Sequence, residues 1–272
     1  MMNRPVEAHP ETHLNATARA AGGWAPLAWS PIDVRCAAGV EPQAGEIARI
    51  VADARDTLEA ATGSSAPVRL RVGAGTEVAA YSPRTGAILA GAGVPAGYAE
   101  LARMLDDRLP PRARASLRVR WAGGGAVPLD LAQFVRSLAI DAYAASLAHA
   151  VGASFPRRWV AIAFEAVARV VSLATSAPED LARQAQLAES VAAVLPPPSA
   201  IADAAVADAV ERLEATRVAV HAFERRGASV LSRFLRTFPV GMAPRSDAQI
   251  ARLALRELAG AVVPPSTEAL AA

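Results

Sequence analysis

Residues 131–175 read LAQFVRSLAIDAYAASLAHAVGASFPRRWVAIAFEAVARVVSLAT, and this stretch decides the fold class of the chain. It contains two long apolar runs, 131–153 and 159–175, each of which is interrupted by two charged side chains. Because of those charges the runs are poor membrane spans, and we interpret them as buried helices over 130–151 and 157–175. The interrupting residues are Arg136 and Asp141 in the first run, and Glu165 and Arg169 in the second.

The chain after this stretch is also helical by its pattern. The expected helices span 178–195, 199–227, 230–238 and 246–260. Ser176 with Glu179, and Ser246 with Gln249, have the spacing of capping boxes, in which two side chains satisfy the first backbone N–H groups of a helix. Gly260 is expected to end the last helix, since glycine adopts the left-handed conformation that terminates helices.

The residues before residue 130 predict a helix and a small sheet. A helix is expected over 42–61, with Gly63 as its stop, and a second helix over 98–109. Alternating apolar residues predict strands over 68–72, 78–81, 87–90 and 117–121. Strands and helices therefore segregate along the chain, which indicates an α+β fold: an N-terminal helix plus a small β-sheet, followed by a mostly α-helical half.

The same pattern suggests a domain organisation. We expect a loosely held N-terminal arm over 1–40, a helix-and-sheet subdomain over 41–125, a helical subdomain over 126–262 and a frayed tail over 263–272.

The composition excludes several classes of function. All 28 basic residues among the 272 are Arg, which excludes a Schiff-base lysine and a P-loop lysine. Cys36 is the single cysteine, so internal disulfides and thiolate-rich zinc sites are excluded. Gly73-Ala74-Gly75 lacks the third glycine of a dinucleotide-binding loop and predicts a turn. The net charge of +2 and the absence of a signal-peptide pattern in Met1–Pro10 predict a cytoplasmic protein without nucleic-acid or membrane partners.

Two hydrophobic segments carry a resemblance to a known family. Residues 155–164 read FPRRWVAIAF, and residues 218–227 read VAVHAFERRG, continued by VLSRFL at 230–235. The first segment resembles the Pro/Trp segment of the gluzincin (peptidase MA-like) zinc metallopeptidases, and the second resembles the helical tail of the same family. The order of the expected elements over 42–260 is also similar to that of this family. The resemblance implies a helix and small sheet in front of a helix that would carry an HExxH motif.

The resemblance also implies where the zinc ligands would lie, and this chain lacks them. The HExxH window falls on 140–144, where Ile140 and Ala144 stand in place of the two histidines. Ile162 stands in place of the third ligand, a glutamate. Aliphatic side chains cannot bind zinc. The resemblance therefore implies a degenerate member with a lost zinc site, and we expect neither a metal nor another cofactor.

Asp141 keeps a carboxylate at the position of the family's general base. Because it lies in an apolar helix, it could act as a general base with a raised pKa, or it could form an ion pair with an arginine. The arginine candidates are Arg136, Arg157, Arg158 or another arginine of the chain.

Three further side chains are candidates for chemistry, and each also has a structural interpretation. Glu165 could be a displaced acid or base, or could pair with Arg169 at i,i+4. Tyr143 could form a hydrogen bond with Asp141 or pack in the core. His221 could meet Asp141 in a His/Asp dyad.

Loss of the ligands has a physical consequence for function. Unpaired polar groups left in a buried cleft are costly, so apolar replacements turn such a cleft into core or into an apolar pocket. We therefore expect a metal-free, pseudo-peptidase-like protein that binds a protein partner or a small hydrophobic ligand between its two halves. The expected lining residues are Ile140, Ala144, Trp159 and Ile162. One alternative is a metal-independent enzyme that acts on a small, partly hydrophobic metabolite with an Asp or Glu base; another is a homo-oligomeric interaction protein built on the helix 199–227.

Overall fold

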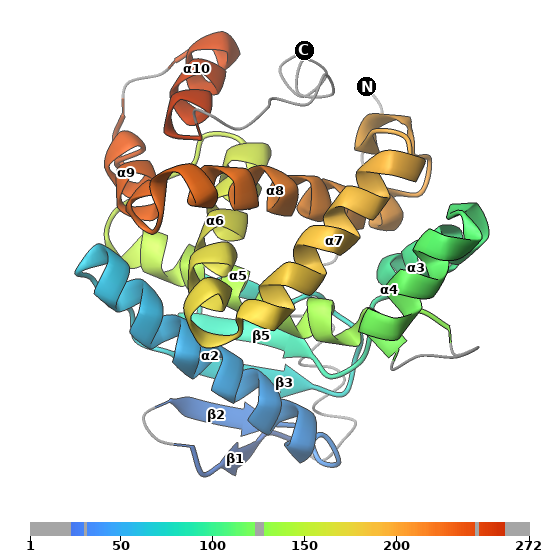
Figure 1. Cartoon of the computed structure of the whole chain (residues 1–272). Coiled ribbons are helices and arrows are strands. Elements are labelled where there is room, and N and C mark those ends of the chain that lie inside the picture. Colours follow the sequence, from blue (N-terminus) through green and yellow to red (C-terminus); the bar gives the residue numbers. More distant parts are fainter. Residues whose placement is uncertain (1–22, 30–31, 123–127, 243–244, 259–272) are drawn as a thin grey trace, which may run out of the picture.

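The computed structural model describes residues 23–29, 32–122, 128–242 and 245–258. Within these ranges a small five-stranded sheet comes first and is followed mostly by helices, which confirms the α+β class (Figure 1). The first part contains β1 (Ala25–Leu27), β2 (Asp33–Cys36), α2 (Glu41–Thr62), β3 (Arg69–Gly73), β4 (Ala80–Ser82), β5 (Ala87–Gly91), α3 (Ala96–Arg108) and α4 (Pro111–Ala122). The second part contains α5 (Ala132–Ala150), α6 (Arg158–Ser176), α7 (Pro178–Val194), α8 (Ala204–Arg226), α9 (Ser229–Thr237) and α10 (Asp247–Glu257).

The sheet has the strand order β1-β2-β3-β5-β4. β2, β3 and β5 run parallel, whereas β1 and β4 pair antiparallel to their neighbours at the two edges. Parallel neighbours need a crossover connection, and α2 supplies it between β2 and β3. α2 lies across the sheet (Figure 1) and buries Ile47, Val51 and Leu58, which share one helical face. Gly63, with φ at 70°, ends α2 in the left-handed conformation, as its sequence predicts.

Two strands lie where the sequence predicts only a loose arm. β1 and β2 fall inside residues 1–40 and form one side of the sheet. In β2, Val34 and Cys36 are buried while Asp33 and Arg35 are exposed, so the alternation typical of a strand is present. It extends over four residues only, which is too short to stand out from the Pro- and Gly-containing sequence around it. Residues 1–22 of the predicted arm lie outside the described part.

The predicted strand over 117–121 is wrong, because these residues belong to helix α4. Leu117 and Trp121 are buried at a spacing of four, which places them on one face of a helix, whereas Val119 between them is 64% exposed. The apolar residues at 117, 119 and 121 fit the period of two of a strand, but only Leu117 and Trp121 are packed in the core. Pro111 is the first residue of α4, a position that suits proline.

The helical part is built around α5 and α6. α6 packs against α5, α8 and α2, and α5 also contacts α2, β4 and β5. Two clusters of buried side chains meet along α5: Phe134 and Leu138 belong to one, and Ile140 and Tyr143 to the other. The first joins α5 to α3, α4, α7 and α8; the second joins it to the sheet, α2, α6 and α9. The sheet-bearing and helical parts therefore share both cores.

The helix ends test the capping predictions. The capping box of Ser246 and Gln249 is present at the start of α10. The one predicted for Ser176 and Glu179 is absent: α7 starts at Pro178 after Ala177, without a side-chain cap. Gly260, the predicted stop of the last helix, lies outside the described residues, and α10 ends at Glu257.

The long helix α8 starts later than predicted. Residues 198–200 form a short 3-10 turn, and α8 begins at Ala204 with Asp203 as its cap. The Asp203 carboxylate accepts hydrogen bonds from the backbone N–H groups of Ala205 at 2.8 Å and Val206 at 3.1 Å. A carboxylate at this position also interacts favourably with the positive end of the helix dipole.

We expect Asp203→Ala to lower the free energy of unfolding by about 1 kcal/mol, because two backbone donors lose their acceptor. Ser199→Ala, at the residue that the sequence analysis takes as the helix start, is the matched control and should leave it unchanged. Urea denaturation of both variants measures the difference. A larger loss for Ser199→Ala than for Asp203→Ala would place the start of the helix at residue 199.

The predicted turn at Gly73-Ala74-Gly75 is confirmed, and it packs against the loop that follows β5. Gly93 N–H donates to Gly75 O at 2.9 Å, and Ala92 N–H donates to Gly73 O at 2.9 Å. A Cβ atom at Gly91 would lie 2.5 Å from the backbone nitrogen of Glu77. The glycines therefore permit the close approach of two loops.

Candidate functional site

A buried charged network joins three helices of the second part. Arg169 of α6 donates from Nη1 to Oδ2 of Asp141 on α5 at 2.7 Å, and Arg212 of α8 reaches the same oxygen at 3.4 Å. The side chains are 0% exposed for Arg169, 2% for Asp141 and 16% for Arg212. Of the two interpretations of Asp141, the structure thus supports the ion pair. The arginines named as candidates pair elsewhere: Arg136 with Glu46, Arg157 with Asp247, and Arg158 with Asp208 and Glu211.

The guanidinium of Arg169 has further partners that hold it in place. Its Nη2 donates to the hydroxyl of Thr216 on α8 at 2.8 Å, and that hydroxyl donates to the backbone carbonyl of Arg212 at 2.7 Å. The guanidinium carbon also lies 5.1 Å from the ring centre of Phe134, a cation–π distance. The guanidinium of Arg169 thus joins α6 to α5, through Asp141 and Phe134, and to α8, through Thr216.

Glu165 joins this network through Arg212 and not through Arg169, so its predicted i,i+4 pair is wrong. Its Oε2 accepts from Arg212 at 3.3 Å. Arg169 lies one turn further along α6 but is directed to Asp141 and Thr216. Burial, followed by the negative charge of Asp141, raises the pKa of Glu165 to about 7, against the opposing charge of Arg212. Burial also raises the pKa of Asp141, against the charges of Arg169 and Arg212.

The network contains a candidate acid–base group, Glu165, next to an Asp141 side chain that two arginines hold in place. A carboxyl group whose pKa lies near 7 can both accept and donate a proton at neutral pH. Oδ1 of Asp141 and Nε of Arg169 have no hydrogen-bond partner among the described residues. The other oxygen of Asp141 carries both arginine contacts, so Oδ1 is the oxygen that could accept a proton without breaking them.

Tyr143 does not take part in this network. It is two residues from Asp141, a separation that puts the two side chains on opposite sides of α5. Burial raises its pKa to about 12, and the charges that act on it are those of Glu59, Arg55 and Asp56 on α2. The structure therefore supports its packing role.

His221 also lies apart from Asp141. Its ring is 38% exposed, with Nδ1 3.4 Å from Glu224 and Nε2 3.8 Å from Glu189 on α7. The predicted His/Asp dyad is therefore wrong. His221 is nine residues from Arg212 along α8, and it is Arg212 that reaches Asp141.

The positions taken as lost zinc ligands are filled by buried aliphatic side chains. Ile140 is 1% exposed, Ala144 0% and Ile162 4%, while Trp159 is half-buried against the core. The resemblance places the family's zinc ligands at residues 140, 144 and 162, where the side chains of this chain offer no donor atom. In the described part of the chain, no group of three or more His, Cys, Asp or Glu side chains is placed to hold a metal ion. The residues do not fit a zinc centre.

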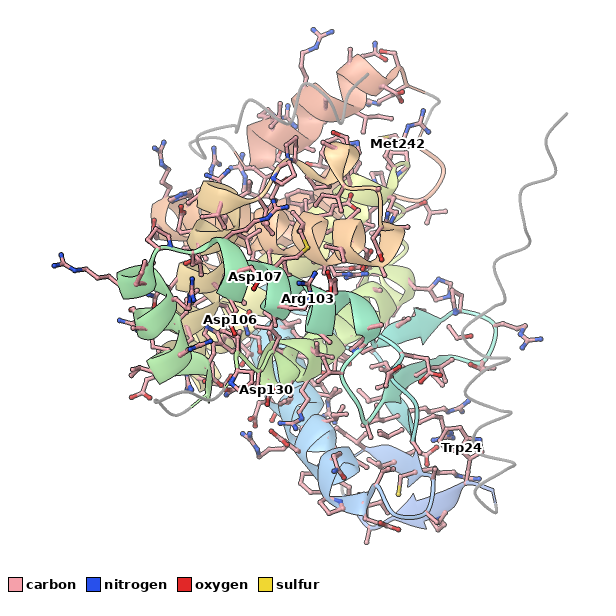
Figure 2. The ribbon with its side chains drawn as sticks, turned by 90° about the vertical axis from the view of Figure 1, so that its right-hand side faces the viewer. Trp24, Arg103, Asp106, Asp107, Asp130 and Met242 are labelled. Carbon is pink, nitrogen blue, oxygen red and sulfur yellow. The ribbon has the colours of Figure 1, made fainter. Side chains whose placement is uncertain are left out.

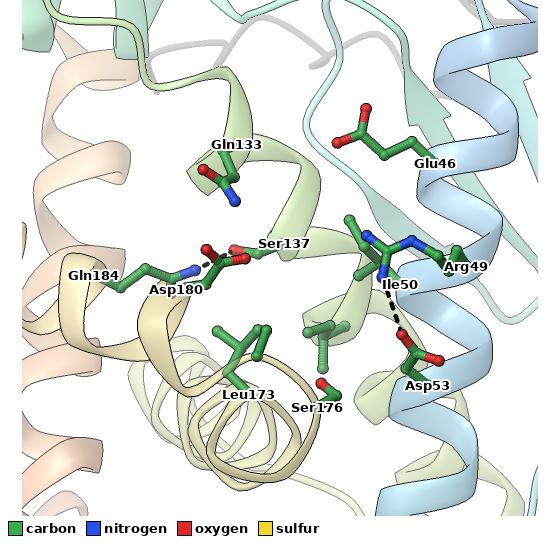
Figure 3. Close-up of a pocket in the computed structure, with 12 residues that line it drawn as sticks. Glu46, Arg49, Ile50, Asp53, Gln133, Ser137, Leu173, Ser176, Asp180 and Gln184 are labelled. Atoms are coloured by element: carbon green, nitrogen blue, oxygen red, sulfur yellow. Dashed lines mark hydrogen bonds and ion pairs between the residues drawn. The ribbon is translucent and has the colours of Figure 1, made fainter. Parts of the chain in front are cut away.

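A pocket opens between α2 and the helices α5, α6 and α7 (Figure 3). We call it the α2–α7 pocket. Its empty volume is about 450 Å³, which includes the open mouth. The lining residues are Glu46, Arg49, Ile50, Asp53, Gln133, Ser137, Ile140, Leu173, Ser176, Ala177, Asp180 and Gln184. Of the expected ligand-binding residues Ile140 lines it, whereas Ala144, Trp159 and Ile162 do not.

Sequence reasoning did not find this pocket, because its walls come from four helices. Ser137 and Gln184 carry no local signature, yet they meet in its inner wall, where Gln184 Nε2 donates to the Ser137 hydroxyl at 3.0 Å. Both side chains are buried, at 4% and 1% exposed. A signal existed only for the charged network: an arginine at 169 within a run of apolar residues requires a buried anion.

Within the described ranges one helix, α6, is long and apolar enough to cross a membrane, but 67% of its most apolar window is buried inside the fold. This is weak evidence for a span, since core helices have the same composition. α6 packs against α2, α5 and α8.

Comparison of the chain with protein-family models finds no match, and neither do comparisons with curated proteins and with solved structures.

Proposed function

We propose that this chain is a metal-free binding protein that takes a small ligand in the α2–α7 pocket. The observation that carries the proposal is the place and lining of this pocket: α2 of the sheet-bearing part forms one wall, and α5, α6 and α7 form the others. Ligand-binding sites in proteins are concave and place polar groups that orient the ligand beside apolar surface. The proposal keeps the expected location of the site, between the two parts, and changes the expected ligand.

The lining argues for a ligand with polar groups. Eight of the 12 lining residues are charged or polar, and the remainder are Ile50, Ile140, Leu173 and Ala177. A purely hydrophobic ligand would leave the buried Oε1 of Gln184, which has no partner among the described residues, without a hydrogen bond. We therefore propose a small polar ligand with an aliphatic part.

The resemblance to gluzincin peptidases is part of this proposal. Its support is that α2 and the small sheet, together with α3 and α4, precede the helix that carries Asp141. Aliphatic side chains at residues 140, 144 and 162 are consistent with a scaffold that has lost its metal chemistry. A cytoplasmic location, and the absence of nucleic-acid and membrane partners, stay predictions.

We expect Ile50→Trp to abolish ligand binding, because the indole would fill the mouth of the pocket from α2. The measurement is ligand-observed NMR with a set of small amines, carboxylic acids, alcohols and amides at millimolar concentration. Ala60→Trp, at an exposed position of the same helix, is the matched control and should bind as the wild type does. Ala177→Phe fills the pocket from the opposite wall and should reproduce the loss.

Two results would contradict the proposal. One is that no compound class binds the wild type; the other is that binding survives in both Ile50→Trp and Ala177→Phe. Metal analysis of the same preparations should show no stoichiometric zinc.

A second candidate function rests on Glu165. Its pKa of about 7 and its 18% exposed side chain suit a general acid–base residue of a metal-independent enzyme. Glu165→Gln would then abolish turnover and leave binding in the α2–α7 pocket unchanged, which separates the two functions.

The third expectation, a homo-oligomer built on the long helix, stays a prediction. The buried side chains of α8 include Val206, Val210 and Leu213, and the helix packs against α3, α6 and α7 of its own chain. That apolar face is therefore not available to a second copy. Light scattering tests the oligomeric state.

A further inference from the structure

We propose that the α2–α7 pocket is specific for a short alkyl amine, an organic cation with an aliphatic body. This inference rests on the proposed function and names the chemical class of its ligand. It follows from the hydrogen-bond acceptors, the charges and the apolar surface of the pocket.

The first argument is a buried acceptor without a partner. Ser137 donates its single hydroxyl hydrogen to the backbone carbonyl of Phe134 at 2.6 Å, so its oxygen can only accept from Gln184. The amide nitrogen of Gln184 must therefore face Ser137, which fixes Oε1 as the other arm of the amide. Oε1 is buried and has no hydrogen-bond partner among the described residues. A ligand N–H would satisfy it, and a hydrogen bond to a charged donor is stronger than one to a neutral donor.

The second argument is the sign of the lining charges. The lining contains three carboxylates, Glu46, Asp53 and Asp180, and one guanidinium, Arg49. Each carboxylate uses one oxygen for an arginine: Glu46 Oε1 for Arg136, Asp53 Oδ2 for Arg49, and Asp180 Oδ1 for Arg183. Arg136 and Arg183 are not lining residues, so two of the three counter-charges lie outside the pocket wall. Each carboxylate is paired, so the lining carries no large net charge, but the second oxygen of each carboxylate stays available as an acceptor, which favours a ligand with several N–H donors over an anion.

The third argument excludes a metal ion as that cation. The carboxylates are distributed around the mouth (Figure 3) on α2 and α7. They do not form a group of three or more donors close enough to hold a metal, which holds for all the described residues. A cation with several N–H donors at its ends and a flexible chain can instead reach separate acceptors.

The apolar patch completes the description of the ligand. Ile50, Ile140, Leu173 and Ala177 line the same pocket as the acceptors. A short chain of methylene groups would bury its surface there, and binding is favoured in proportion to the apolar area removed from water. A small hydrated cation would not use this surface.

Isothermal titration calorimetry at pH 7 and low salt tests the inference with three probes of similar length: 1,4-diaminobutane, 1,4-butanediol and succinate. We expect the diamine to bind at least tenfold more tightly than the diol, and succinate to show no binding. Gln184→Met removes the free acceptor at similar volume and should weaken diamine binding about tenfold.

Asp53→Asn changes a side chain that is 42% exposed, so folding is not at risk. Asp53 forms an i,i+4 ion pair with Arg49, and its matched control is Asp107, which forms an i,i+4 pair with Arg103 on α3 (Figure 2). Asp53→Asn should weaken diamine binding severalfold, whereas Asp107→Asn should leave it unchanged. Equal affinity for diamine and diol, or equal effects of the two Asn variants, would overturn the inference.

The outcomes separate this inference from the proposed function. If a neutral or anionic class binds and Ile50→Trp removes it, the specificity for amines is wrong and the pocket remains the ligand site. If no probe of any class binds the wild-type chain, both proposals are wrong.

Discussion

Arg169→Met is expected to lower the free energy of unfolding by about 3–5 kcal/mol, because it removes one partner of a buried ion pair. Arg169 is fully buried, and its 2.7 Å contact with Asp141 is the shorter of the two arginine contacts of that carboxylate. In the variant Asp141 keeps only the longer contact with Arg212. The carboxylate then either stays buried and poorly compensated or takes up a proton, and both cost stability. Urea denaturation at pH 7 measures the loss, and Arg103→Met, in an exposed ion pair, should show no measurable change.

A double variant separates the cost of an orphaned charge from the cost of lost packing. Arg169→Met with Asp141→Leu replaces both charges by apolar groups, and Arg212 with Glu165 then remains as a neutral pair. We expect this variant to recover most of the stability that Arg169→Met loses, since a buried pair often gives little net stability over apolar residues of similar volume. If the double variant is as unstable as the single one, the loss comes from packing against Phe134 and not from the charge of Asp141.

The parts of the fold that the sequence predicts well are those with long periodic patterns and explicit ends. α2 has apolar residues at helical spacing and Gly63 as its stop, and α10 has the Ser246–Gln249 capping box. β2 and α4 are predicted poorly because their signals are short or ambiguous. Four residues of alternation do not define a strand, and Leu117 and Trp121 satisfy the periods of both a strand and a helix.

The sequence indicates which single residues of the candidate site need a partner, but not which partners they meet. A carboxylate at residue 141 in an apolar helix requires a partner, and the sequence correctly indicates an arginine. The identity of that arginine depends on how α6 and α8 cross α5, which no local pattern encodes. The same limit applies to Gln184 and Ser137, which are 47 positions apart and meet only through packing of α7 against α5.

Glu165 should make the stability of the protein fall as the pH rises from about 5 to 8. Its pKa is about 7 in the folded chain against 4.5 for an ordinary glutamate, so between these values the folded state binds the proton and the unfolded state does not. Stability falls with pH wherever the folded state binds more protons. The stability that proton binding by Glu165 contributes is fully present below pH 4.5, the pKa in the unfolded chain. It is lost as the pH rises through about 7, the pKa in the folded chain. A rise from 4.5 to about 7 is worth about 3 kcal/mol.

Glu165→Gln isolates this contribution, because the amide resembles the protonated acid at every pH. We expect the variant to gain about 2–3 kcal/mol relative to the wild type between pH 5 and pH 8, measured by urea denaturation at intervals of one pH unit. Glu189→Gln on α7, where the side chain is 57% exposed, is the control and should follow the wild-type curve. If the free energies of unfolding of the wild type and of Glu165→Gln change with pH in parallel, Glu165 is ionised in the folded chain throughout this range. The ion pair with Arg212 would then outweigh burial, and the acid–base candidate function would lose its support.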